Sequence, residues 1–245
     1  MQATFVGLGF LVGFLVGLTG IGGGALMTPS LIFLGVEPLT AVGTDLLYAT
    51  VTRVFGVIFH GRRGRIRYDI IFRLFAGSLP AIVLGGIILR EINRGVLNEY
   101  LTPLLGGILV LSALLSLPKG EFHVPVKPRW AYLYLLGFIV GLTVQFTSVG
   151  AGVIVGFILM NIAKLDPRDV VGVTITYGLA LSALSFLNYA GIGGVDYSLA
   201  GTLILGTVPG VYLGTHLNRV ADRGRLKTAI NVIILLIGLF TLLGV

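Results

Sequence analysis

The chain has 245 residues, of which 56% are hydrophobic and only 11% charged, and its mean hydropathy is +1.01. A soluble globular domain carries about 25% charged residues, so this composition excludes an ordinary soluble domain and predicts a membrane protein. The net charge of +7 does not indicate a nucleic-acid partner, because the basic residues sit mostly at the ends of apolar runs. The chain contains no cysteine, which excludes a disulfide framework and a thiol nucleophile.

The first half begins with an apolar run that stops at a glycine-rich break. A span needs roughly 20 mostly apolar residues, so a short piece after the break is expected to form a hairpin with the first run. Three longer spans then follow. The predicted elements are a helix over 4–18, the break over 19–24, a short helix over 25–34, and spans over 39–59, 69–89 and 100–117, with a loop over 90–98.

The second half repeats this plan after a polar, proline-containing linker. Its predicted elements are a helix over 130–144, a break over 145–152, a short helix over 153–163, and spans over 170–189, 197–217 and 228–243. We therefore predict a first membrane repeat over 1–117, a cytoplasmic linker over 118–129 and a second membrane repeat over 130–245.

The two halves also match residue by residue. GFLVGLT over 13–19 matches GFIVGLT over 137–143, and a small insertion then brings Gly22 and Gly24 onto Gly150 and Gly152. Beyond the breaks one constant offset explains the matches, which include Pro38 with Pro167, Tyr48 with Tyr177, Tyr68 with Tyr197, Gly77 with Gly206 and Pro80 with Pro209. Glycines and prolines aligned at a fixed offset are hard to obtain by chance, so the chain is predicted to be an internal duplication.

Basic residues indicate how the two repeats are oriented, because Lys and Arg mark cytoplasmic loops. The loop after the first long span carries four arginines, whereas its counterpart over 190–196 carries none. Equivalent loops thus face opposite sides, which is the pattern of inverted-topology repeats in secondary transporters. We predict an all-α, multi-pass protein of the cell membrane, in which each repeat is a broken-helix hairpin plus three transmembrane helices and both termini lie outside.

The two breaks are the main site candidates. A helix start exposes unpaired backbone N–H groups and a partial positive charge, which suits an anion, and irregular backbone at membrane depth must be buried in protein or line a cavity. The alternative is that these glycines only allow tight helix packing, which is our interpretation of the spaced glycines within the helices. The predicted anion-binding residues are Thr19, Gly22, Gly23 and Gly24 at the first break, and Thr143, Gln145, Thr147, Ser148, Gly150 and Gly152 at the second.

Two ionisable residues, Asp45 and Arg53, lie well inside one predicted span. Such residues are costly in lipid and are candidates for function by default. A helix separates them by about 12 Å, so they do not form a direct pair along it. Arg53 would attract an anionic substrate or pair with a carboxylate elsewhere, and Asp45 would bind a coupling proton or cation. The alternative is that either residue caps a helix end or joins two spans.

Three segments carry a resemblance to a known family: GLTGIGGGALMT over 17–28, EPLTAVGT over 37–44 and GFIVGLTVQFTSVGAG over 137–152. They resemble the sulfite exporter TauE/SafE family of membrane transporters, and the resemblance covers nearly the whole chain. It implies movement of small sulfur-containing anions such as sulfite, thiosulfate or organosulfonates. The second break departs from the family's run of glycines, since 145–148 precede Val149 and Gly150.

Several functions fit these patterns to different degrees. A secondary transporter would move the anion by alternating access, with proton or ion coupling, whereas a passive anion channel would not accumulate it. An intramembrane enzyme is disfavoured, because no histidine lies in the middle of a span and no HExxH motif occurs. We expect no metal and no cofactor, and the expected partners are a small anion and the lipid bilayer, with no nucleic acid. A homo-oligomer is compatible with the sequence.

Overall fold

The computed structural model describes residues 2–19, 24–60, 67–116, 131–217 and 223–243. Within these ranges the chain forms helices joined by short turns and contains no strand, which confirms the all-α prediction. The predicted linker over 118–129 lies outside the described residues. The helices are α1 (Gln2–Thr19), α2 (Gly24–Phe33), α3 (Pro38–His60), α4 (Tyr68–Glu91), α5 (Arg94–Ser116), α6 (Ala131–Thr147), α7 (Val153–Asn161), α8 (Pro167–Gly191), α9 (Tyr197–Leu217) and α10 (Arg223–Leu243).

Several predicted boundaries are wrong; α10, for example, begins at Arg223, five residues before the predicted span over 228–243. The loop predicted over 90–98 is mostly helical, because α4 continues to Glu91 and α5 already begins at Arg94. Asn93 explains the early start: its Oδ1 accepts a 2.8 Å hydrogen bond from the Gly95 amide, so it caps α5 in the way that asparagine prefers. The second break is also shorter than predicted, since α6 runs on to Thr147 and includes Gln145.

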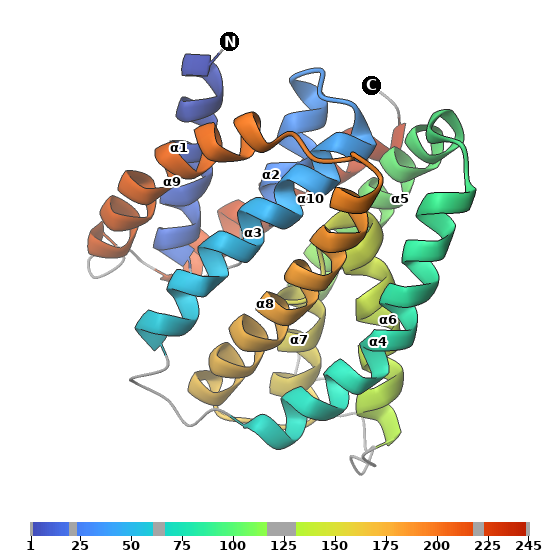
Figure 1. The fold of residues 1–245 in the computed structure, drawn as a ribbon. Helices are drawn as coiled ribbons and strands as arrows, with labels where there is room; N and C mark the ends of the chain where they lie inside the picture. Colours follow the sequence, from blue (N-terminus) through green and yellow to red (C-terminus); the bar gives the residue numbers. More distant parts are fainter. Residues whose placement is uncertain (1, 20–23, 61–66, 117–130, 218–222, 244–245) are drawn as a thin grey trace.

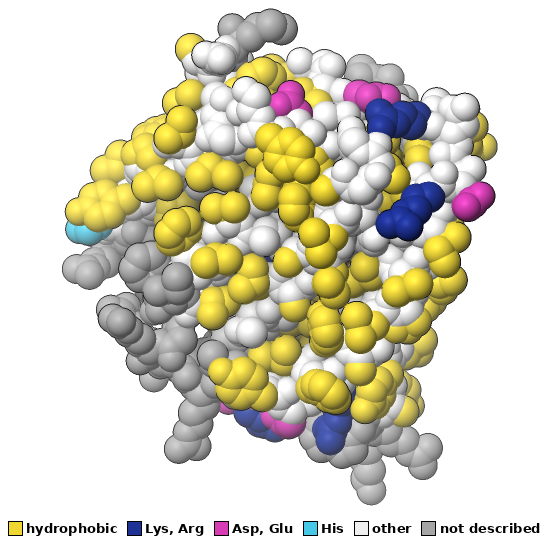
Figure 2. Space-filling view, in the orientation of Figure 1, with side chains coloured by type: hydrophobic (Ala, Val, Ile, Leu, Met, Phe, Trp, Pro, Cys, Tyr) yellow, Lys and Arg dark blue, Asp and Glu magenta, His cyan; other side chains and the backbone are white. Residues whose placement is uncertain are grey.

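The surface of the molecule is that of a membrane protein. Four described helical segments are long and apolar enough to cross a bilayer: Tyr68–Glu91, Arg94–Ser116, Asp169–Gly191 and Tyr197–Gly214. Figure 2 shows hydrophobic side chains covering the middle of one face, with charged side chains gathered toward its upper and lower ends. Large apolar residues such as Phe72, Val83 and Leu205 are exposed on these helices. These faces are suited to contact lipid.

Glycines bring two pairs of helices into close contact, α1 with α9 and α4 with α6. A Cβ atom at Gly9 of α1 would lie 2.2 Å from the carbonyl oxygen of Leu203 in α9. A Cβ atom at Gly137 of α6 would lie 2.1 Å from the carbonyl oxygen of Leu74 in α4. The prediction that the spaced glycines serve helix packing is therefore confirmed at these two positions.

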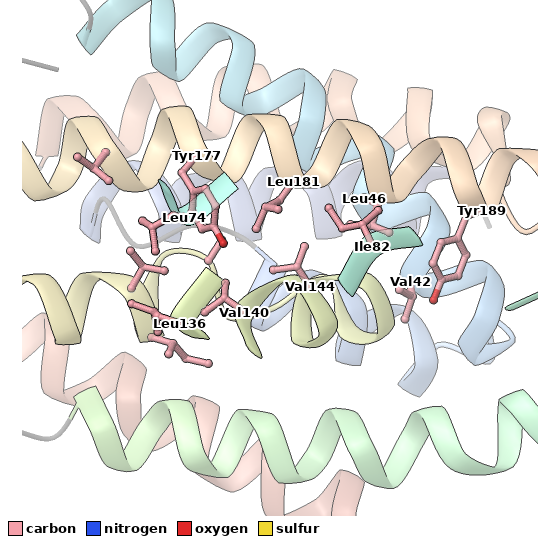
Figure 3. Close-up of a cluster of buried hydrophobic side chains, with 14 of the residues drawn as sticks. Val42, Leu46, Leu74, Ile82, Leu136, Val140, Val144, Tyr177, Leu181 and Tyr189 are labelled. Atoms are coloured by element: carbon pink, nitrogen blue, oxygen red, sulfur yellow. The ribbon is translucent and has the colours of Figure 1, made fainter. Parts of the chain in front are cut away.

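The centre of the molecule is formed by α3 and α8, which contact each other and run diagonally across Figure 1. Figure 3 shows the buried apolar side chains that fill the space between these helices and α6, among them Leu46, Val144 and Leu181. In Figure 1 the end of α3 and the starts of α4, α6 and α8 lie at the lower end of the molecule. The turns from α2 to α3, α4 to α5 and α8 to α9 lie at the upper end.

Candidate functional site

The turn between α6 and α7 is the better described of the two breaks. Ser148 and Gly150 both have a positive φ, of 60° and 118°. Gly150 must be glycine, since this backbone region strains any side chain and an added Cβ would lie 2.9 Å from Thr143 Oγ1. The first backbone bond of α7 joins the Ile154 amide to the Gly150 carbonyl at 3.0 Å. The amides of 151–153 therefore come before the first bond of the helix and are the donors that a helix start leaves for a ligand.

This turn faces the start of α2 across a small cavity. The cavity has a volume of about 20 Å³, which is room for one water molecule. Its wall thus combines the start of α2, which follows the first break, and residues of the second break with the arginine that the sequence singled out. The lining residues are Ala25 from α2, Arg53 from α3, and Ser148, Val149, Gly150, Gly152 and Val153 from the turn and α7.

Arg53 is held against the cavity by α8. Its Nη1 donates a 2.9 Å hydrogen bond to the carbonyl oxygen of Gly178. The arginine lies flat on this glycine, where an added Cβ would be only 3.1 Å from Arg53 Nε. A guanidinium has five N–H donors in a planar fork, so one bond to α8 leaves donors for a ligand in the cavity.

Asp45 lies deeper in the protein and is 0% exposed. Its Oδ2 accepts a hydrogen bond from Thr28 Oγ1 of α2. The side chain of Ser148 and the charge of Arg53 also act on this carboxylate. Neither Asp45 Oδ1 nor Ser148 Oγ, however, has a partner in good hydrogen-bond geometry within the described residues. The buried carboxylate of Asp45 therefore acts on two residues that line the cavity, Ser148 and Arg53, without lining it itself.

The hydroxyls of Thr143 and Thr147 serve their own helix, because they donate to the carbonyl oxygens of Val140 and Thr143 at 2.9 and 2.6 Å. Thr147 Oγ1 in addition accepts a bond from the Val149 amide at 3.3 Å, which helps to close the turn. Both residues thus support the break rather than line the cavity.

Gln145 points away from the cavity, toward α4 and α8. Its Oε1 lies 3.4 Å from Asn188 Nδ2, and its side chain packs against Gly85. Among the predicted residues of the first break, Gly22 and Gly23 lie outside the described residues. Thr19 ends α1 and Gly24 begins α2.

Sequence patterns did not single out Thr28, although it is the direct partner of Asp45. The signal was weak, because Thr28 is one of two hydroxyl residues, with Ser30, in a short and mostly apolar helix. The structure shows that Thr28 is 0% exposed. The sequence patterns also did not indicate that two pairs of buried hydroxyl groups are in contact. Thr207 Oγ1 lies 3.0 Å from Tyr48 OH, and Ser78 Oγ lies 2.6 Å from Tyr177 OH.

Comparison with known proteins identifies the family of this chain. The family model described as sulfite exporter TauE/SafE matches residues 5–241. The chain belongs to the sulfite exporter TauE/SafE family. It is 34% identical to the "Probable membrane transporter protein YjnA" of Bacillus subtilis (strain 168), over 98% of this chain and 99% of that protein. It is 27% identical to "Probable membrane transporter protein YdhB" of the same organism, over 95% and 97% of the two chains.

The chain is also similar to a protein of an archaeon over most of its length. The "Probable membrane transporter protein MJ0441" of Methanocaldococcus jannaschii is 24% identical over 96% of this chain and 93% of that protein. No solved structure matches the chain. The TauE/SafE assignment and the apolar helices together make the chain a multi-pass membrane transporter of this family.

Proposed function

We propose that this TauE/SafE transporter moves small sulfur-containing anions, such as sulfite, thiosulfate or an organosulfonate, across the cytoplasmic membrane by alternating access. The observation that carries the proposal is the single cavity at which Arg53, the start of α2 and the turn before α7 meet. The proposed substrate class rests on membership of the family, and the proposed site rests on the geometry of the cavity.

The electrostatics of the cavity favour an anion. Each helix start is equivalent to roughly +0.5 of an elementary charge, and Arg53 adds a full positive charge in a planar fork that fits oxyanions. The oxygens of a sulfur oxyanion would accept hydrogen bonds from the amides before α7 and from the guanidinium. Asp45 reduces the positive charge of the site but does not line it.

Repeated contacts support the proposed duplication. The pair Ser78 and Tyr177 stands between α4 and α8, and the pair Thr207 and Tyr48 stands between α9 and α3. Ser78 also donates to the carbonyl of Gly137 at 2.8 Å, and Thr207 donates to that of Gly9 at 2.9 Å. The contact of α4 with α6 thus corresponds to the contact of α9 with α1 when equivalent helices of the two halves are compared.

These contacts favour a different register for the first helix of each repeat. They pair Gly9 with Gly137 and Gly13 with Gly141, because Gly13 packs on Thr207 as Gly141 packs on Ser78. This pairing is shifted by one helical turn from the match of the GFLVGLT and GFIVGLT segments. It also brings Gly22 onto Gly150 without any insertion, so the second break needs no extra residues.

The size of the cavity favours a gated transporter over an open channel. A volume of about 20 Å³ holds one water, so an anion of four or more heavy atoms needs a wider state of the site. The tight glycine contacts of α1 with α9 and of α4 with α6 make each pair a unit that would move as one body against α3 and α8.

The proposed orientation places the lower end of Figure 1 in the cytoplasm, because the arginine-rich segment 62–67 follows α3 at that end. The start of α1 and the end of α10 then lie on the outside, as the charge pattern predicted.

Uptake into proteoliposomes tests the proposal. Labelled sulfite, thiosulfate, sulfate and a sulfonate are offered to vesicles that contain the purified protein, loaded with the same unlabelled anion or with none. A transporter gives saturable uptake that internal unlabelled anion accelerates, and a channel gives uptake that internal anion does not accelerate. Absence of saturable flux for all four anions would contradict the proposed substrate class.

A further inference from the structure

We propose that Asp45 couples transport to protons, and that one proton binds its carboxylate when one anion occupies the cavity beside Arg53. The inference rests on the proposed transport function and names its coupling ion. The structural basis is a fully buried carboxylate, next to Thr28 of α2 and Ser148 of the turn before α7, that within the described residues has a hydrogen bond to only one of its oxygens.

The surroundings of Asp45 are suited to a carboxyl that gains and loses a proton. Thr28 donates to Oδ2, whereas Oδ1 has no hydrogen bond within the described residues. The side chain of Ser148 also acts on this carboxylate. A buried anion with one unsatisfied oxygen is costly. A proton on Oδ1 removes both the negative charge and the need of this oxygen for a donor.

The charged and titratable groups that act on Asp45 are few. Within the described residues they are Arg53 and Tyr48, both on α3 itself. The neighbouring α2 presents Thr28 and has no charged or titratable residue over Gly24–Phe33, and α7 has none over Val153–Asn161. The other helices packed on α3 are α5, α8 and α9, and within the described residues none of their charged or titratable groups acts on the Asp45 carboxylate. In the empty transporter, Arg53 therefore provides the positive charge that balances the Asp45 carboxylate.

An anion in the cavity would remove that balance. It would bind Arg53 directly and place a second negative charge near Asp45, in surroundings of low dielectric where like charges repel strongly. A proton on Asp45 relieves this repulsion, so proton and anion bind together more tightly than either does alone. The coupling is reciprocal, and anion affinity must rise as the pH falls.

A proton fits this position better than a sodium ion. Sodium needs several oxygen ligands, and within the described residues the other side-chain oxygens that act on the carboxylate are those of Thr28 and Ser148 alone. The positive charge of Arg53 would also repel a metal ion. A proton needs one oxygen only, and Oδ1 is available.

The second repeat indicates how many protons are expected to bind with each anion. In the register of the repeated contacts, Thr28, Asp45 and Arg53 correspond to Gly156, Thr174 and Ser182. An added Cβ at Gly156 would lie 3.9 Å from Thr174 Cγ2, so the same two helices meet there without a charge. Thr174 Oγ1 donates to the Val171 carbonyl at 3.1 Å. The site therefore contains one proton-binding carboxyl, and one proton is expected per anion.

Binding and flux measurements on the full chain test the coupling. Thiosulfate and a sulfonate are the probes, because their own charge does not change near neutral pH, whereas that of sulfite does. Three assays are run in proteoliposomes: exchange of labelled anion without any gradient, accumulation driven by a pH gradient, and accumulation driven by a sodium gradient. The variants are Asp45→Asn and, as a matched control, Glu99→Gln, which neutralises an exposed acid on α5.

We expect wild type and Glu99→Gln to accumulate the probe when the outside is acidic, with apparent affinity falling about tenfold per unit rise in pH where Asp45 is ionised in the empty protein. We expect Asp45→Asn to exchange the probe without dependence on pH and to accumulate none. Wild-type protein that exchanges the probe but does not accumulate it under a pH gradient, accumulation driven by sodium instead, or accumulation by Asp45→Asn would overturn the coupling and leave the transport function intact. Absence of exchange in wild type would overturn the transport function itself.

Two measurements keep the test decisive if Asp45→Asn does not fold. The pH dependence of anion binding to wild type needs no variant, and an anion affinity that does not change with pH rejects the coupling. Thr28→Val removes the hydrogen bond that favours the ionised carboxylate, so it should raise anion affinity at alkaline pH several-fold. An affinity that Thr28→Val leaves unchanged at every pH would contradict the proposal.

Discussion

Arg53 Nη1 donates a hydrogen bond of 2.9 Å to the carbonyl oxygen of Gly178, and this bond joins α3 to α8 at the wall of the cavity. The bond fixes the plane of the guanidinium while its remaining donors stay available for an anion. Lysine carries the same charge but lacks the planar fork, so it cannot hold this position and bind an oxyanion in the same way.

Replacement of Arg53 should weaken anion binding. Hydrogen bonds to charged groups contribute about 1.5–3 kcal/mol, so Arg53→Ala is expected to raise the apparent Kd of the transported anion about 10- to 100-fold, and Arg53→Lys by less. Equilibrium binding to purified protein measures the effect. The control is Arg90→Ala, which removes an exposed arginine at the end of α4. An unchanged Kd in folded Arg53→Ala would remove Arg53 from the site.

A bulky residue at the second break should block transport. Gly150→Val forces a β-branched side chain into a φ of 118° and toward Thr143, so exchange of the labelled anion is expected to fall to background. Gly201→Val is the control, because an added Cβ there has nothing within 4 Å. A bulky residue at Gly23, which lies outside the described residues, should have the same effect as Gly150→Val. Undiminished exchange in both variants would place the site elsewhere.

The buried hydroxyl pairs should contribute to stability. Tyr48→Phe and Tyr177→Phe each delete one partner of a buried hydrogen bond, at a cost of about 1 kcal/mol. A loss of this size lowers the Tm of a chain of this length by about 2–4 °C. Thermal unfolding in detergent measures it, with Tyr100→Phe as a control at an exposed tyrosine. Equal Tm values for all three variants would argue that the pairs are unimportant.

The repeated helix contacts predict matched effects at two glycines. Gly9→Ala and Gly137→Ala each place a Cβ atom within 2.2 Å of a backbone carbonyl of the partner helix, so the helices must move apart. We expect each variant to lose about 1–3 kcal/mol of stability, as overpacking does. Gly7→Ala should be neutral, because nothing lies within 4 Å of its added Cβ. A large effect at only one of the two glycines would speak against equivalent contacts in the two halves.

The sequence predicted the order and type of the helices well, because long apolar runs and glycine breaks are local signals. It predicted helix ends less well. The cap at Asn93 was not recognised, and Gln145 was placed in the break although α6 continues past it to Thr147. A buried glutamine can remain in a helix when its side chain meets another amide, here the half-buried Asn188.

The composition of the site was only partly predictable. Arg53 and Asp45 stood out because charges within a span are rare, and Arg53 indeed lines the cavity. Thr28 did not stand out, since its importance depends on a contact with Asp45 across 17 residues of sequence. The roles of Thr143 and Thr147 were likewise hidden, because a hydroxyl can serve a ligand or its own helix and only the fold shows which.

Amide hydrogen exchange at the starts of α2 and α7 tests the central claim most directly. If backbone N–H groups at both helix starts bind the transported anion together with Arg53, a saturating concentration should slow exchange over 24–28 and over 150–156 in wild type, and in neither segment of Arg53→Ala. Exchange in both segments that stays the same with and without an anion that the protein demonstrably transports would contradict an anion site between the two breaks.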